Sequence, residues 1–223
     1  AFDQPALAVL HPALALHRLP LIDTLELSPI AFPQNPYHRL VKDYKLCTTT
    51  RNDPVRDAEL AYELFLDQRE ALQQRVAEYP DEALCLHFLL AAESGKGVAN
   101  LFAALRHKLR PSHAEARAAW ERATVGNVCI SGQRQLLDCC FSDADWHKPL
   151  AYVLSWLRVA GGNSVLPPWV GLNFPRVREA IANLRGVPCA DPACTWCRDQ
   201  HDLETLLARY FPGITRFRAT PAT

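Results

Sequence analysis

The sequence predicts a mostly α-helical protein with a small metal-binding module near its C-terminus. Apolar residues recur at helical spacing along the middle of the chain, and prolines and glycines separate these stretches. Three cysteines then fall within nine residues, at positions 189, 194 and 197. Such crowding differs from the spread cysteines of a small disulfide-linked protein and favours a metal site.

The composition is that of a globular protein without a strong charge bias. With 223 residues, of which 49% are apolar, the chain can bury the core of one or two domains. Lys+Arg and Asp+Glu are both 24, so any contact with DNA has to come from a local basic patch. No apolar run reaches the roughly 18 to 20 residues of a membrane helix, and no signal segment opens the chain. We therefore expect a cytoplasmic protein with no membrane partner.

The start of the sequence suggests a piece of a longer protein. There is no methionine in the chain, and it opens inside an apolar phrase, Ala1-Phe2-Asp3. We expect further protein sequence on the N-terminal side.

Helices are expected along most of the chain after residue 54. The first 50 residues contain six prolines, which predict short strands, turns and one or two helical turns. Apolar residues at helical spacing predict a helix over residues 55–76, and Ser112 with Glu115 has the spacing of a capping box. Other helices are expected over residues 82–93, 101–109, 113–122, 132–141, 145–159, 175–184 and 202–210. Residues 161–170, rich in glycine and proline, predict a loop.

The C-terminal cluster predicts one structural zinc ion. Cys189-x4-Cys194-x2-Cys197-x3-His201 offers three thiolates and one imidazole, a closed tetrahedral ligand set that leaves no position for a substrate. Ordinary buried cysteines or a redox pair are the plainer alternatives, because Cys-x2-Cys also occurs in disulfide oxidoreductases. An iron–sulfur cluster usually needs a fourth cysteine, which Cys129, Cys139 or Cys140 could supply.

Three acidic phrases near the N-terminus carry a resemblance. Phe2-Asp3, Ile22-Asp23-Thr24-Leu25 and Asp57 resemble the later motifs of DEDD-type 3′–5′ exonucleases, the DnaQ-like relatives of the ribonuclease H fold. The resemblance implies an α/β remnant of that fold over residues 1–79. It also implies that Asp3 and Asp57 are catalytic carboxylates, which bind Mg²⁺ or Mn²⁺ in the intact exonuclease domain.

The sequence departs from the exonuclease pattern at two points. The first motif of the family, Asp-x-Glu, does not occur before Asp3, and Asn52 stands where the family has its general-base histidine. An amide does not accept a proton from water at neutral pH. We therefore expect this chain to have no nuclease activity by itself.

The resemblance extends to most of the chain. Residues 35–44, 52–54, 161–170 and 188–201 are similar to the region that precedes the motor in RecQ-like ATP-dependent DNA helicases fused to such an exonuclease. This implies a helical connector over residues 80–186 and a zinc module over residues 187–223. The ATP site of the motor would lie outside this sequence. Residues 94–97, Ser-Gly-Lys-Gly, lack the glycine and the hydroxyl residue that a P-loop needs.

Local basic and aromatic residues are candidates for contact with DNA. They are Arg106, Lys108, Arg110, Trp196 and Arg198. The alternative for the basic residues is a solvated helix face. We expect the chain to bind and position DNA for repair or recombination within a helicase. The competing interpretation is a non-enzymatic, zinc-stabilised helical adaptor that binds another protein.

Overall fold

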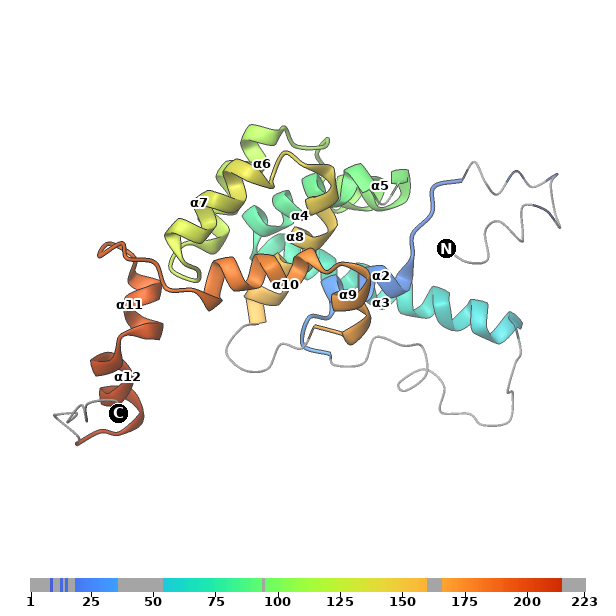
Figure 1. The fold of residues 1–223 in the computed structure, drawn as a ribbon. Helices are drawn as coiled ribbons and strands as arrows, with labels where there is room; N and C mark the ends of the chain where they lie inside the picture. Colours follow the sequence, from blue (N-terminus) through green and yellow to red (C-terminus); the bar gives the residue numbers. More distant parts are fainter. Residues whose placement is uncertain are drawn as a thin grey trace.

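The computed structural model describes residues 19–35, 54–93, 95–159 and 166–213, and the single positions 9, 13 and 15. Asp3 and Asn52 lie outside these ranges. The regular structure of the described residues is helical, without a strand, so these residues do not show the expected α/β remnant. The elements, drawn in Figure 1, are α2 (Thr24–Ala31), α3 (Pro54–Glu78), α4 (Pro80–Glu93), α5 (Gly95–Arg106), α6 (His113–Thr124), α7 (Ile130–Cys139), α8 (Ala144–Val159), α9 (Pro168–Asn173), α10 (Arg176–Ile181), the π-helical turn η3 (Ala182–Gly186), α11 (Thr195–His201) and α12 (Leu203–Tyr210).

Helix α4 is the centre of the helical body. It packs against α3, α5, α6 and α8, and α8 in turn contacts α2 and α10 (Figure 1). The apolar core is continuous from Leu27 in α2 to Leu184 in η3. The first two predicted domains, residues 1–79 and 80–186, therefore share one core in their described parts.

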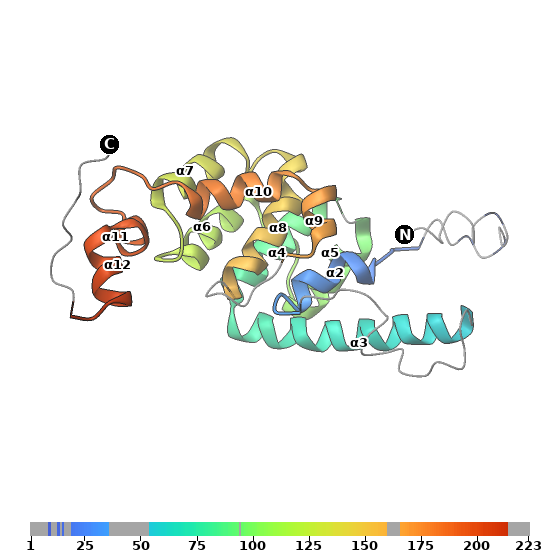
Figure 2. The same cartoon turned by 60° about the horizontal axis from the view of Figure 1, so that its bottom comes forward.

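Sequence periodicity predicted most of the helices correctly. The helix expected over residues 55–76 is α3, and its N-terminal half extends beyond the body (Figure 2). The capping box is confirmed, because Glu115 N donates to Ser112 Oγ at 3.3 Å and Ser112 N donates to Glu115 Oε2 at 2.8 Å. The expected helices over 82–93, 132–141 and 145–159 correspond to α4, α7 and α8 within a few residues, whereas α5 begins six residues before the helix expected over 101–109.

Among the short helices, α2 gives the helical turns expected in the first 50 residues, whereas α9 and α11 differ from the sequence predictions. Helix α2 forms in the proline-rich first 50 residues because the Asp23 carboxylate accepts from Leu25 N at 2.9 Å and from Glu26 N at 3.3 Å. Helix α9 occupies the end of the predicted loop, since a proline is well tolerated in the first turn, where its missing N–H has no helical partner. Helix α11 lies inside the cysteine cluster.

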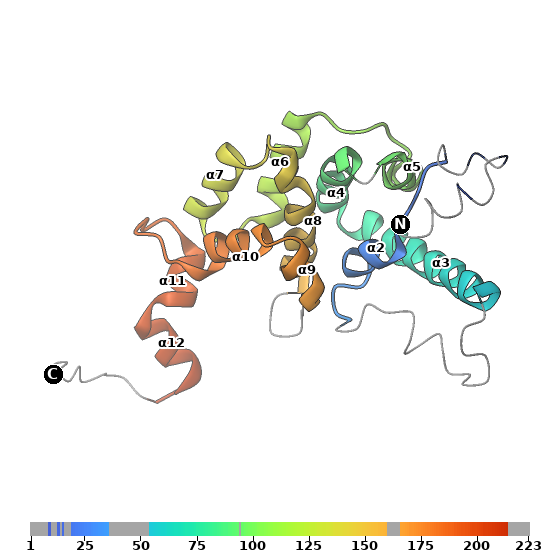
Figure 3. The same cartoon turned by 45° about the vertical axis from the view of Figure 1, so that its right-hand side comes forward.

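Helices α11 and α12 extend from one end of the body (Figures 1 and 3). Their junction with the body is a small separate cluster of buried residues, Cys129, Cys194 and Cys197, to which Trp196 adds a half-buried ring. In the described parts of the chain, no helix combines the length and the apolar character needed to cross a membrane.

Candidate metal centre

The predicted cysteine cluster folds as a tight turn that leads into helix α11. Ala193 N donates to Asp191 Oδ1 at 2.9 Å and Cys194 N donates to Asp191 O at 3.0 Å. These bonds make Cys194 the N-cap of α11, and Cys197 follows one turn later. Cys189 N donates to Cys197 Sγ at 3.3 Å, which brings the first and last cysteines of the turn together.

The fourth cysteine comes from the helical body. Cys129 is the N-cap of α7, and its backbone N–H donates to the carbonyl of Leu184 at 2.7 Å. The next residue, Ile130, donates its N–H to Cys194 Sγ at 3.5 Å. A Cβ added at Gly132 would lie 1.9 Å from the backbone oxygen of Asn183, so only glycine lets α7 approach η3 this closely. This approach places the start of α7 beside the cysteine turn.

The four sulfurs of Cys129, Cys189, Cys194 and Cys197 all lie within 4.8 Å of one another. Zinc–sulfur bonds of about 2.3 Å in a tetrahedron put sulfurs about 3.8 Å apart, so a small contraction of this group encloses an ion. Three of the residues are buried and Cys189 is half-buried. The group could hold a metal such as zinc, and with four protein ligands the site would be closed to substrate.

The thiol pKa values of Cys189 and Cys197 are shifted in opposite directions. A hydrogen bond from the Asp191 backbone, opposed by burial, lowers the pKa of Cys189 to about 6. Burial raises the pKa of Cys197 to about 12. A bound cation favours the thiolate form of every ligand, so it would remove this difference.

The structure places the predicted fourth ligand elsewhere. His201 is the exposed last residue of α11 and is not in the four-residue group. Of the cysteines that the sequence offered as a fourth ligand, Cys139 and Cys140 lie at the C-terminal end of α7, whose ten residues span about 15 Å. Cys129 lies at the other end of α7, and no local spacing in the sequence links it to the cluster.

A second contact joins the cysteine turn to the body. The Arg185 guanidinium lies over two indole rings, with its Cζ atom 4.5 Å from the Trp196 centroid and 5.1 Å from the Trp156 centroid. Arg185 Nε also donates to Asn127 O at 3.0 Å, two residues before Cys129. Trp196, a candidate for base stacking, therefore already contacts a guanidinium within the chain.

The predicted basic residues are spread over two ends of the molecule. Arg106 is the last residue of α5, and Lys108 and Arg110 follow it, whereas Arg198 lies in α11. The three ribbon views put α5 and α11 far apart, with α8 between them (Figures 1, 2 and 3). Arg106 Nη1 lies 2.8 Å from His87 Nδ1, and the Arg110 guanidinium lies over the Phe88 ring at 5.4 Å. Lys108 is exposed.

Of the two predicted catalytic carboxylates, the structure describes only Asp57. Asp57 lies in the first turn of α3. Asp3 lies outside the described residues, so its distance from Asp57 is not given by the structure. No protein-family model, curated protein or solved structure matches the chain.

Proposed function

We propose that this chain is a non-catalytic, DNA-positioning part of a RecQ-like ATP-dependent DNA helicase, in which a structural zinc ion fixes a C-terminal module to a helical body. The structural role rests on one observation. The sulfur of Cys129 at the start of α7 meets those of Cys189, Cys194 and Cys197 within 4.8 Å. A metal held there would join two segments that are distant in sequence, and it would contribute its binding energy to folding.

The helicase part of the proposal rests on the sequence resemblance. Residues 1–79 would be the end of an exonuclease-like α/β domain, with Asp57 at the head of α3 as one of its Mg²⁺ or Mn²⁺ ligands. ATP would bind the motor outside this sequence. The work of the present chain would then be to hold DNA during repair or recombination, without nuclease or ATPase activity of its own.

The second candidate is a zinc-stabilised adaptor that binds another protein. It is favoured by the separation of the basic residues on α5 and α11 and by the intramolecular contacts of Arg106 and Arg110. These contacts occupy guanidinium groups that would otherwise be available to phosphates.

Binding of a labelled single-stranded oligonucleotide at several salt concentrations separates the two candidates. For the DNA function we expect weak, sequence-independent binding that falls steeply with salt. Lys108→Glu should lower the slope of log K against log salt by about 0.7 or more, since each neutralised phosphate of a single strand contributes roughly that amount. Lys96→Glu, an equal charge change on an exposed residue at the start of α5, is the control. Undetectable binding at low salt would contradict the DNA function and favour the adaptor.

A further inference from the structure

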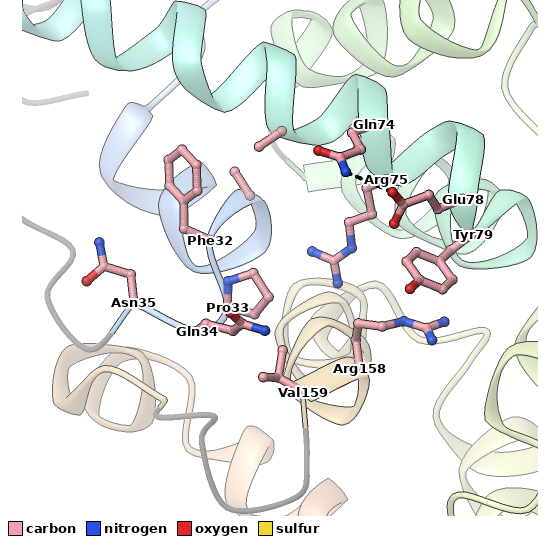
Figure 4. Close-up of a pocket in the computed structure, with 12 residues that line it drawn as sticks. Phe32, Pro33, Gln34, Asn35, Gln74, Arg75, Glu78, Tyr79, Arg158 and Val159 are labelled. Carbon is pink, nitrogen blue, oxygen red and sulfur yellow. Dashed lines mark hydrogen bonds between the residues drawn. The ribbon is translucent and has the colours of Figure 1, made fainter.

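A pocket between the turn after α2, the C-terminal end of α3 and the end of α8 has the features of a ligand site. Its volume is about 660 Å³, within the range of small-molecule sites. The turn after α2 forms one side, with Phe32, Pro33 and Asn35 (Figure 4). Tyr79 and the end of α8 form the other side.

Two guanidinium groups in this pocket share one buried carboxylate. Glu82 is 1% exposed; its Oε2 accepts from Arg158 Nε at 2.9 Å, and its Oε1 pairs with Arg75. Arg75 is itself buried and also donates to the carbonyl of Ile30. Figure 4 shows Arg75 pointing between the turn after α2 and the pair formed by Tyr79 and Arg158. Among the described residues, two guanidinium charges therefore face a single buried carboxylate, an excess of one positive charge.

Arg158 is positioned to meet an anion. Its Cζ lies over the Tyr79 ring, 3.6 Å from the centroid, in a cation–π contact. Arg158 lines the pocket, about a third of its side chain is exposed, and its Nε is bonded to Glu82. A guanidinium fixed in this way suits bidentate recognition of a phosphate.

The remaining walls suit a planar, partly polar body. Phe32, Pro33, Ala71 and Val159 offer apolar surface, and amide groups stand at the rim, including those of Gln34 and Gln74. Gln74 Nε2 donates to Glu78 Oε1 at 2.8 Å, which holds an exposed carboxylate at the rim, where water screens its charge. Amide and carboxylate groups can pair with the hydrogen-bonding edge of a base.

We propose that this pocket binds a nucleoside monophosphate, either free or as the end of a strand, with its phosphate on Arg158 and its base against Phe32 and Pro33. The proposal needs neither the candidate metal centre nor the basic residues Arg106, Lys108 and Arg110. Its failure is therefore distinguishable from failure of the DNA function above.

Methyl NMR of the full, zinc-loaded chain tests the proposal directly. Titration with dAMP should give saturable shifts of the Ala71 and Val159 methyl signals, and deoxyadenosine and inorganic phosphate should each bind at least tenfold more weakly. A 5′-phosphorylated oligonucleotide that competes with dAMP would assign the pocket to a strand end, and one that does not would assign it to the free nucleotide. Absence of saturable shifts at millimolar dAMP, or equal binding of phosphate and dAMP, would overturn the proposal.

Variants add a second, independent measurement. Arg158→Gln should weaken dAMP binding at least tenfold, whereas Arg134→Gln, which removes an exposed arginine on α7, should leave it unchanged. Because Arg158 pairs with a buried carboxylate, Gln74→Ala at an exposed rim position is tested beside it and should weaken binding severalfold. Unchanged dAMP affinity in both pocket variants would contradict the assignment.

Discussion

The guanidinium of Arg185 lies over the indole ring of Trp196, 4.5 Å from the ring centroid, and joins η3 to α11 beside the four cysteines. The same side chain contacts Trp156 of α8 and donates to Asn127 O. Trp196 precedes the ligand Cys197, and Asn127 lies two residues before Cys129. Arg185 therefore links the cysteine turn of α11 to the segment that precedes Cys129, through contacts that do not involve a metal.

Replacement of Arg185 should weaken metal retention. We expect Arg185→Ala to release zinc to a chromogenic chelator about 5 to 30 times faster than the wild type, since a partly desolvated cation–π contact contributes about 1 to 2 kcal/mol. Arg185→Lys should lie between the two, because lysine keeps the charge but not the planar fork. Arg209→Ala, an exposed arginine of α12, should release zinc at the wild-type rate. Equal release rates for all four proteins would show that Arg185 has no part in holding the site.

The identity of the fourth ligand can be tested with one pair of variants. Cys129→Ser should lose most of the zinc affinity, and its cobalt-substituted form should show weaker thiolate charge-transfer absorption than the wild type. His201→Gln should retain one equivalent of metal and the wild-type cobalt spectrum, because His201 is exposed and outside the sulfur group. The opposite pattern would restore the three-cysteine, one-histidine site that the sequence spacing predicted.

The approach of α7 to η3 gives a third prediction. Gly132→Ala should unfold at a lower temperature and bind zinc more weakly, since its Cβ would lie 1.9 Å from the Asn183 oxygen, and α7 must move away with Cys129. Gly186→Ala is the matched control, because the nearest atom to its added Cβ, Ala182 Cβ, lies at an ordinary 3.7 Å. Thermal unfolding with a zinc titration measures both effects. Normal zinc affinity in Gly132→Ala would show that the close approach does not position the site.

The sequence predicted those elements that depend on residues close together in the chain. The period of apolar residues located α3, and the Ser112 and Glu115 pair located the start of α6, because both depend on residues within a few positions of each other. Three members of the candidate metal group were predicted in the same way, from the spacing of Cys189, Cys194 and Cys197. The one or two helical turns expected in the first 50 residues include α2, but its start was not predicted because the cap at Asp23 was not recognised.

The fourth ligand depends on packing between distant segments. Cys129 reaches the site only because Gly132 lets α7 contact η3, and nothing in the sequence near Cys129 signals this. His201 has a favourable spacing but lies at the exposed end of α11. The contact between Arg185 and Trp196, eleven residues apart, uses an aromatic ring that the sequence offered for DNA.

The last prediction concerns the pH dependence of stability. His87 is 1% exposed, and burial, with the nearby charges of Arg106 and Arg110, lowers its pKa to about 4. An unfolded chain has a histidine pKa of about 6.5, so between pH 6.5 and 4 the unfolded state binds a proton that the folded state does not. The free energy of unfolding should therefore fall with decreasing pH in this window, by roughly 1.4 kcal/mol per unit at most from this residue.

The variant His87→Gln isolates this contribution, because glutamine keeps an acceptor for Arg106 Nη1 but does not titrate. Burial also lowers the pKa of His147, and acid weakens thiolate binding to a metal, so both proteins lose stability in acid for shared reasons. The difference between the two urea unfolding curves, measured from pH 7.5 to 4.5 at constant zinc, removes these shared effects. We expect that difference to be constant above pH 7 and to change in favour of His87→Gln as the pH falls below 6.5. A difference that does not vary with pH would show that His87 takes up protons equally in the folded and unfolded chains.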